Sequence, residues 1–205
     1  MNYFITGIGT DVGKTVVSAI LVEALGADYW KPVQCGLPRD TEVVAGLVSN
    51  KNSVFHQERH LLKEPASPHQ AASLQGVEIS LNDFMVPGTN HDLVIEGAGG
   101  IMVPLNQEEF MLDLIEKLAD KVVLVSSLYL GSINHSLLSI EVLKARGIDI
   151  SGIIFNGPSN PHSQRIIQSY SGSKCLLHLE PANNIDSQII KKWAQALKKN
   201  LELNC

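Results

Sequence analysis

The segment from Gly7 to Thr15 combines glycines, a lysine and a threonine in the pattern of a phosphate-binding loop. Glycines let the backbone curl so that successive N–H groups face inward. Lys14 is placed to reach the outer phosphates of a nucleotide, and the Thr15 hydroxyl is placed to bind Mg²⁺. An apolar run, Tyr3–Thr6, precedes the loop, and an apolar stretch, Thr15–Leu25, follows it. This order of strand, loop and helix predicts an enzyme that uses ATP.

The spacing within the loop differs from the usual pattern. Five residues separate Gly7 from Gly13, whereas the common phosphate-loop motif has four at this place. The loop is therefore a longer variant, and its side chains Thr10 and Asp11 are positioned to touch nucleotide or substrate. The alternative is a chance Gly-Lys-Thr in an ordinary strand–helix turn, which the flanking segments disfavour.

Two charged residues stand at the ends of other predicted strands. Lys31 follows the apolar run Asp28–Trp30, and Glu96 ends the run Leu93–Glu96, before four residues rich in glycine. The carboxyl ends of parallel strands meet at one edge of a sheet, so both side chains are expected near the loop. An acid at this place is typical of the carboxylate that positions Mg²⁺ in nucleotide hydrolases. The alternatives are an exposed surface lysine and a strand-ending glutamate in a flexible turn.

The elements that must position these residues alternate along the chain. Continuous apolar runs, which are typical of strands buried on both faces, continue after the glycines: Val122–Ser126, Gly152–Phe155 and Cys175–Leu179. A helix is expected at His135–Arg146 with Gly147 as its C-cap. A terminal helix with an apolar face is expected from Ile189, Ile190, Trp193, Ala194 and Leu197. The sequence therefore predicts a doubly wound α/β fold, with a mostly parallel sheet and helices on both faces.

Length and composition bound the class of protein. A chain of 205 residues fits one domain, 1–205, and the least regular stretch, Leu37–Asn90, is expected to supply loops over the carboxyl edge of the sheet. Sixteen Lys and Arg against twenty-one Asp and Glu give a net charge of −5, which disfavours a general nucleic-acid binder. No targeting segment or membrane span is evident, and Cys35, Cys175 and Cys205 form no CxxC pair, so we expect a cytoplasmic protein with reduced thiols.

Taken together, the motifs resemble those of the dethiobiotin synthetase family. The resemblance runs through nearly the whole chain in the family's order. It is carried by Gly7–Thr15, Lys31–Val33, Pro65–His69, Glu96–Gly100, Leu130–His135 and Asn156. It implies a P-loop ligase that uses ATP and Mg²⁺ to add CO2 to 7,8-diaminononanoate, through a phosphorylated carbamate, and to close the ring of dethiobiotin in biotin biosynthesis.

The resemblance also implies roles for particular residues. Catalysis is expected from Lys14, Lys31 and Thr10. Mg²⁺ is expected on Thr15, Asp40 and Glu96, with Glu42 as an alternative to Asp40. The nucleotide is expected on Gly9, Thr10, Asp11, Val12, Gly13, Lys14, Thr15, Glu96, Gly97, Gly99, Gly100 and Asn156. The substrate is expected on Lys31, Cys35, Pro68, His69, Gly131, Ser132, Ile133 and Asn134. The last four open a helix whose free N–H groups would hold the substrate's far carboxylate, and the site would be completed across a homodimer.

Two positions depart from the family pattern, and other activities share its motifs. Cys35 stands where the family usually has a serine or threonine, and His178–Pro181 replaces a glycine-containing segment near the nucleotide base. An ATP-driven switch of the partitioning or septum-placement type carries a signature lysine where this chain has Gly9. An amidotransferase-linked ligase for a corrin precursor normally continues into a glutaminase domain, for which 205 residues leave no room. A small-metabolite kinase remains an alternative, with the same phosphate site and a different acceptor.

Overall fold

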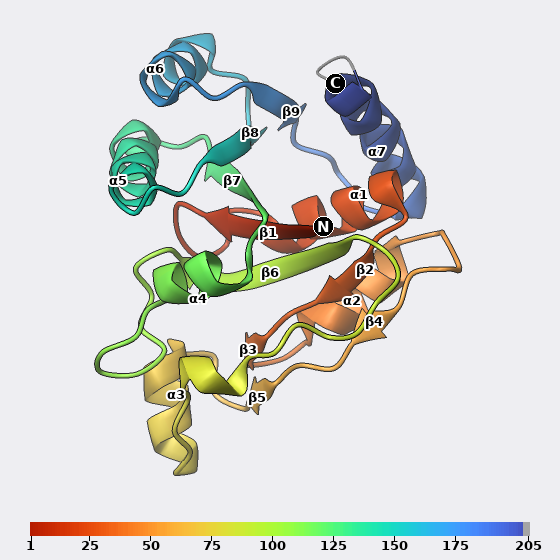
Figure 1. The fold of residues 1–205 in the computed structure, drawn as a ribbon. Helices are drawn as coiled ribbons and strands as arrows, with labels where there is room; N and C mark the ends of the chain where they lie inside the picture. The colour runs from red at the N-terminus through yellow and green to blue at the C-terminus, as the bar shows by residue number, and fades with distance from the viewer. Residues whose placement is uncertain (203–205) are drawn as a thin grey trace.

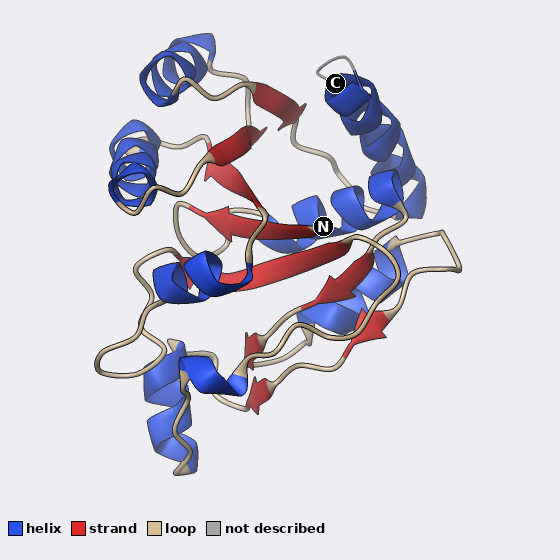
Figure 2. Cartoon of the chain, in the orientation of Figure 1, coloured by secondary structure: helices blue, strands red, loops and turns tan. Residues whose placement is uncertain are grey.

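The computed structural model describes residues 1–202, which form a central sheet of seven strands covered by helices (Figures 1 and 2). The strands run in the order β4-β2-β6-β1-β7-β8-β9, and each neighbouring pair is parallel. Their bounds are β1 Asn2–Gly7, β2 Asp28–Trp30, β4 Phe55–His56, β6 Leu93–Gly100, β7 Lys121–Ser127, β8 Ile150–Asn156 and β9 Cys175–Leu179. The predicted doubly wound α/β fold is confirmed.

Helices pack on both faces of the sheet and divide the core in two. One set of buried residues joins α1 (Lys14–Leu25), α2 (Asp40–Leu47) and α7 (Ser187–Glu202) to one face. The other joins α3 (Pro68–Gln75) and α4 (Met111–Leu118) to the opposite face. Helices α5 (Ser132–Ala145) and α6 (Pro161–Ser171) lie beside β7 and β8 (Figure 1).

The strand order places a crevice beside β1. From β1 the chain crosses to β2 on one side of the sheet, and later builds β7, β8 and β9 on the other side. Ligands in open α/β sheets bind at such a reversal, outside the carboxyl ends of the strands. The phosphate loop follows β1 directly, so it lies at this position.

The stretch expected to be loops is more regular than predicted. It contains α2, β4, β5 (His60–Leu62), α3 and a short 3-10 helix at Leu81–Asp83. β5 pairs in parallel with β3 (Val33–Cys35) to form a separate two-stranded sheet. These elements are short, two to eight residues, so none shows the long apolar period that identifies a helix or strand from sequence.

Several helix and strand boundaries differ from the predicted ones by a few residues. The helix expected at His135–Arg146 spans Ser132–Ala145. Its C-cap is Arg146, and Gly147, predicted to be the cap, is the left-handed residue that follows. β6 continues beyond its predicted end at Glu96, through the glycines, to Gly100. The docked terminal helix is confirmed, because Ile190, Ala194 and Leu197 are buried while its lysines are exposed. Cys205 lies outside the described residues.

Across residues 1–202, no helix combines the length and the apolar character that crossing a membrane requires.

Candidate active site

The phosphate loop connects the carboxyl end of β1 to α1. Gly13, the N-cap of α1, has φ 98°, a conformation that residues with a Cβ rarely adopt. A Cβ at this position would lie 2.4 Å from Nδ2 of Asn156, so side-chain contact from β8 also requires glycine here. The Asn156 amide donates to the Val12 carbonyl at 3.0 Å. The loop is therefore held from one side by Asn156, a residue predicted to bind the nucleotide.

Lys14 is buried at the start of α1. Its Nζ donates to the Gly9 carbonyl at 2.9 Å, so its side chain folds back along the loop. Burial lowers the pKa of Lys14 to about 8, although the charges of Glu96 and Asp40 act in the opposite direction. A desolvated cation at a helix N-terminus binds phosphate oxygens strongly, because both the ammonium and the free backbone N–H groups favour an anion.

Glu96 is the centre of the polar contacts beside the loop. It is 1% exposed and lies midway along β6. Its Oε1 accepts from Lys31 Nζ at 2.9 Å and from Thr15 Oγ1 at 3.0 Å. Burial alone would raise the pKa of this carboxyl, but the Lys31 ammonium and the hydrogen bonds hold it below its usual value. Glu96 is therefore an ionised carboxylate in the wall of the site.

Lys31 is enclosed by two carboxylates. It is 5% exposed just after β2, with Glu96 on one side and Asp40, in the first turn of α2, on the other. Burial lowers the pKa of Lys31, but the two carboxylates outweigh this and raise it, so the side chain remains a cation. The expectation that Lys31 points toward the loop edge agrees with this position.

The structure distinguishes the two acids of α2. The backbone N–H of Asp40 donates to Gln34 Oε1 at 3.1 Å, and its side chain faces Lys31. The Glu42 side chain is 65% exposed and pairs with Arg39 at 3.3 Å. Asp40, rather than Glu42, therefore faces the site.

These residues line one cleft of about 740 Å³. Its walls come from the phosphate loop, β2, β6, the Gln34–Asp40 segment and the Pro65–Pro68 turn. Of the predicted site residues, it brings together Thr10, Asp11, Gly13, Lys14, Thr15, Lys31, Cys35, Asp40, Pro68, Glu96 and Gly99. Burial raises the pKa of the Cys35 thiol to about 11, so it is a protonated group in the wall.

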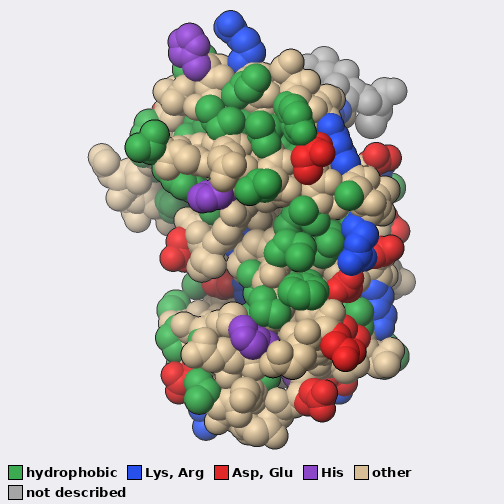
Figure 3. Space-filling view, turned by 90° about the vertical axis from the view of Figure 1, so that its left-hand side faces the viewer, with side chains coloured by type: hydrophobic (Ala, Val, Ile, Leu, Met, Phe, Trp, Pro, Cys, Tyr) green, Lys and Arg blue, Asp and Glu red, His purple; other side chains and the backbone are tan. Residues whose placement is uncertain are grey.

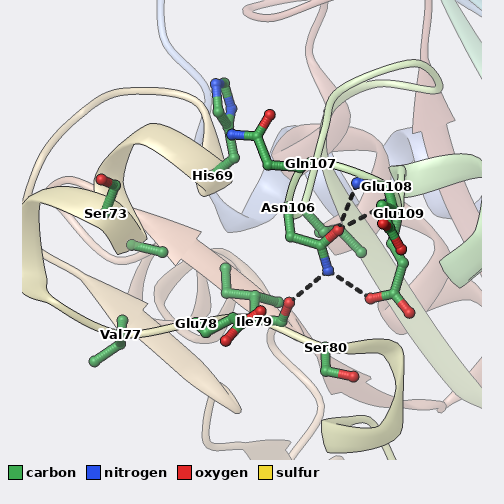
Figure 4. A pocket seen from close by; sticks show the side chains of 12 residues that line it. His69, Ser73, Val77, Glu78, Ile79, Ser80, Asn106, Gln107, Glu108 and Glu109 are labelled. Atoms are coloured by element: carbon green, nitrogen blue, oxygen red, sulfur yellow. Dashed lines mark hydrogen bonds between the residues drawn. The ribbon is translucent and has the colours of Figure 1, made fainter.

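His69 lies outside this cleft, although the adjacent Pro68 lines it. His69 faces a neighbouring pocket of about 530 Å³, with Gln107 beside it in Figure 4. In that pocket the Asn106 amide donates to the Ile79 carbonyl and to Glu109, at 2.8 and 2.7 Å (Figure 4). The His69 ring is itself bonded to Ser67 at 3.0 Å.

The segment Gly131–Asn134 is also separate from the cleft. Gly131, with φ 102°, is the N-cap of α5, and Ser132 is 1% exposed. The other three residues line a pocket of about 800 Å³ against the start of α6. Within one chain, this pocket and the Lys31 cleft have no lining residue in common.

The remaining predicted nucleotide residues pack behind the loop. Gly9 and Gly100 line an apolar groove with Met102 and Leu138, between the loop and α5. Gly97 lies against the Phe4 ring. A Cβ at this position would lie 2.9 Å from Phe4 Cε1, so the close packing requires glycine here. Hydrophobic side chains gather on the face of the molecule viewed in Figure 3. Exposed hydrophobic residues near the start of α5 and the turn after β6 are Met102, Leu130, Ile133 and Leu138.

The donor set suits a hard divalent cation that shares its coordination with phosphate. Thr15, Asp40 and Glu96 offer oxygen atoms at one edge of the cleft. Mg²⁺ prefers such oxygens and binds through one or two carboxylates, with substrate phosphates and water completing its shell. Among residues 1–202 there is no cluster of three or more His, Cys, Asp or Glu side chains that would form an all-protein metal cage.

Two side chains of the site were not predicted. The Tyr29 hydroxyl donates to Glu96 Oε2 at 2.9 Å, and Gln34 links Asp40 to the Gly36 carbonyl. Tyr29 sits inside an apolar run, where its ring predicts core packing and its hydroxyl gives no separate signal. Gln34 belongs to a short strand, β3, that the sequence pattern did not reveal.

Comparisons with known proteins show which family the chain belongs to. Residues 1–188 match a protein family described as an AAA domain. The chain is 50% identical over 201 residues to the ATP-dependent dethiobiotin synthetase BioD of Cytophaga hutchinsonii, covering 97% of this chain and 98% of that protein. It is 52% identical over 202 residues to the protein of the same name from Christiangramia forsetii, covering 98% and 97%.

Solved structures share the fold at low identity. The septum site-determining protein MinD of Pyrococcus horikoshii, complexed with Mg-ADP, superposes with a TM-score of 0.56 and 14% identity, covering 100% of this chain and 99% of that one. A plasmid partition protein of Borrelia burgdorferi, bound to AMPPNP, superposes with a TM-score of 0.56 and 10% identity. The match covers 99% of this chain and 97% of that one. At such identity the likeness shows the fold alone.

Proposed function

The chain belongs to the ATP-dependent dethiobiotin synthetase family, and from this premise we propose how its own residues divide the work of the reaction. The protein is an ATP-dependent ligase of biotin biosynthesis that forms a carbon–nitrogen bond. We further propose that residues 1–205 form a single ligase domain. The cytoplasmic location expected from the sequence stays a prediction.

The proposed substrates are 7,8-diaminononanoate, CO2 and ATP. One amine attacks CO2 and loses a proton, which gives a carbamate. A carbamate oxygen then attacks the γ-phosphorus of ATP, and the bond to the β-phosphate oxygen breaks to release ADP. The second amine attacks the carbonyl carbon of this mixed anhydride. The C–O bond to phosphate breaks, the amine loses a proton, and the cyclic urea and phosphate leave.

Lys14 and the loop are proposed to hold the phosphates. The transferring phosphoryl group spreads negative charge over its oxygens, and catalysis depends on cations already in place around it. Lys14 is desolvated and lies beside the free N–H groups at the start of α1. Thr10, which lines the same cleft, is proposed to contact the transferring phosphate.

Lys31 is proposed to stabilise the carbamate and the phosphate it attacks. Its ammonium is oriented by Glu96 and Asp40 and lies in the same cleft as Lys14. A carbamate is an anion with a low intrinsic reactivity, so a fixed cation both binds it and offsets repulsion from the γ-phosphate. The buried Lys31 between two carboxylates is the observation that carries this proposal.

Thr15, Asp40 and Glu96 are proposed to hold Mg²⁺. The ion would supply positive charge to the phosphate oxygens when bound. Glu96 and Thr15 already lie 3.0 Å apart, oxygen to oxygen, so the chain orients both without further movement. Asn156 is proposed to contact the base, since it stands beside Val12 and Gly13 at the far side of the loop.

The far end of the substrate is proposed to reach a second subunit. Gly131–Asn134 present a helix N-terminus, which favours a carboxylate, but they line a pocket separate from the Lys31 cleft. Exposed hydrophobic residues stand around this segment, including Leu130 and Ile133. A homodimer that covers them would bring the partner's helix start to the cleft, as the family resemblance implies.

A product assay tests the proposal. The protein is incubated with ATP, Mg²⁺, ¹³C-bicarbonate and 7,8-diaminononanoate, and the cyclic urea is detected by mass. The expected product carries one ¹³C and appears in equal amount to ADP. ADP without the cyclic urea, or an unlabelled urea, would contradict it. Omission of the diamine is the control, and it should abolish most ADP formation.

The switch-protein alternative gains no support from the site. The solved switch-type structures show the fold alone, and this chain has Gly9 where that class carries its signature lysine. A small-metabolite kinase would transfer phosphate without closing a ring, so the product assay separates it from the ligase.

A further inference from the structure

Tyr29 contacts Glu96 through the carboxylate oxygen that Thr15 and Lys31 do not touch. Its side chain is 0% exposed, and its hydroxyl donates to Glu96 Oε2 at 2.9 Å. The other oxygen, Oε1, accepts from Thr15 and Lys31. The two oxygens of one carboxylate therefore have different partners, and only Oε1 touches groups assigned to substrate or metal.

The sheet register fixes this arrangement. β2 and β6 are parallel, with Tyr29 opposite Val94 and Trp30 opposite Ile95. Side chains alternate across a strand, so Tyr29 shares a sheet face with Val94 and Glu96. The Tyr29 ring packs on Phe55, with centroids 6.3 Å apart, and extends along the strands to reach the carboxylate two residues beyond Val94.

We propose that Tyr29 is a positioning residue whose hydroxyl holds Oε2 of Glu96, so that Oε1 is presented to Thr15 at the Mg²⁺ side of the cleft. The inference rests on the proposed function, which assigns Thr15 and Glu96 to the ion. A terminal carboxylate rotates easily about its last torsion. A donor on one oxygen fixes that rotation, and groups that orient metal ligands in this way change metal affinity about 10- to 100-fold.

The test variant is Tyr29→Phe, which removes the hydroxyl and keeps the ring on Phe55. The matched control is Thr89→Val, at the opposite end of β2. There the Thr89 hydroxyl donates to the buried carboxylate of Asp28, which is not part of the cleft. Both variants remove one hydroxyl donor from one buried carboxylate, and Thr89→Val also removes the acceptor of the His91 N–H at 2.9 Å, so the control loses at least as many hydrogen bonds as Tyr29→Phe.

The readout is ADP binding by calorimetry across a Mg²⁺ titration, with metal-free ADP measured in parallel. For Tyr29→Phe we expect the Mg²⁺ concentration for half-maximal tightening to rise about 10-fold, while metal-free ADP affinity changes less than about twofold. Thr89→Val is expected to leave both values unchanged. An unchanged Mg²⁺ midpoint in Tyr29→Phe, or an equal rise in Thr89→Val, overturns the proposal.

A measurement on the wild-type protein does not depend on the stability of any variant. A hydroxyl proton held between Tyr29 and Glu96 exchanges slowly and should be resolved by NMR. Its resonance is expected to move when Mg²⁺ and ADP are added together, and to stay in place with ADP alone. A proton that is unresolved, or that ignores Mg²⁺, counts against the proposal.

Glu96→Gln separates this inference from the function on which it rests. If Glu96→Gln leaves the Mg²⁺ midpoint unchanged, the metal assignment itself fails. If Glu96→Gln raises the midpoint and Tyr29→Phe does not, only the role of Tyr29 fails. If each single variant raises the Mg²⁺ midpoint, adding Tyr29→Phe to Glu96→Gln is expected to raise the midpoint no further, because the two changes act through one carboxylate.

Discussion

A buried carboxylate lies near each end of β2, Asp28 in the strand itself and Glu96 on the neighbouring strand β6, and only Glu96 lines a cleft. At the amino end, Asp28 is 2% exposed and accepts from Val54 N–H at 2.8 Å, from His91 Nδ1 at 3.0 Å and from Thr89. At the carboxyl end, Glu96 is equally buried but is surrounded by Lys31, Lys14 and the Thr15 hydroxyl.

The difference lies in what surrounds each carboxylate. Burial raises the pKa of Asp28, but donors from nearby loops outweigh it and lower the pKa, so the acid serves to fasten those loops to the sheet. Glu96 shares its cations with Asp40 in a cleft of about 740 Å³ that opens at the strand ends. A buried ionised acid thus indicates function only where buried cations and an accessible cavity lie beside it.

The largest expected effects come from the two lysines of the cleft. Lys14→Ala and Lys31→Ala are each expected to lower turnover about 10³-fold or more, because each removes charge facing the transferring phosphate. Metal-free ADP should bind Lys31→Ala almost normally and Lys14→Ala more weakly. Steady-state kinetics and calorimetry measure both.

Lys192→Ala is the matched control for these variants, since this lysine is exposed on α7. It should retain wild-type turnover. Near-normal turnover in Lys14→Ala would show that Lys14 does not face the transferring phosphate. If the main defect of Lys31→Ala is weakened ADP binding, that lysine binds the nucleotide instead of the carbamate.

Exchanging the two buried acids for amides tests the comparison directly. Glu96→Gln is expected to lower kcat about 10²-fold or more, whereas Asp28→Asn is expected to keep activity and lower stability by about 1–3 kcal/mol. Thermal unfolding and kcat are measured for both. If Asp28→Asn loses more activity than its unfolded fraction explains, the proposed functional difference between Asp28 and Glu96 is wrong.

The acids of α2 provide a smaller contrast within a single helix turn. Asp40→Asn should raise the Mg²⁺ requirement and lower kcat about 10-fold or more, because Asp40 faces Lys31 and the cleft. Glu42→Gln should change neither, since its side chain is mostly exposed. Mg²⁺ titrations of activity compare the two, and an equal effect of both changes would mean that the helix N-terminus as a whole matters.

The smallest expected effect concerns the reactivity of the Cys35 thiol. With a pKa of about 11, its thiolate fraction near pH 8 is about 10⁻³. Alkylation by iodoacetamide should therefore be slow at pH 8 and rise tenfold per pH unit toward about 11. The experiment uses a chain with Cys175→Ser and Cys205→Ser so that one thiol reacts, and a rate that levels off near pH 8.5 would contradict the assignment.

The sequence predicted the catalytic edge better than its periphery. Gly7–Thr15, Lys31 and Glu96 were placed together because each stands at the predicted end of an apolar strand, and parallel strands end at one edge. Asp40 and Glu42 could not be separated, since helix α2 is only eight residues long and its orientation depends on Gln34 and Arg39. Tertiary contacts, rather than local pattern, decided which acid faces the cleft.

Residues beyond the edge show the same limit. Pro68 and His69 are neighbours in one motif, yet the turn at α3 directs only the first into the cleft. Tyr29 was hidden because a tyrosine in an apolar strand is indistinguishable from core packing until its hydroxyl is located. The roles proposed for Gly131–Asn134 would require a second subunit, which no single-chain pattern describes.

Oxygen transfer in a single turnover tests the central claim most directly, that the Lys31 end of β2 activates a carbamate by phosphorylation. The enzyme is mixed rapidly with ¹⁸O-bicarbonate, the diamine, ATP and Mg²⁺, and the phosphate is analysed by mass before bicarbonate oxygen exchanges with water. A carbamate oxygen attacks the γ-phosphorus and stays bonded to it when the C–O bond breaks. We therefore expect one ¹⁸O in each phosphate formed. Phosphate without label, alongside normal ring closure, would contradict it.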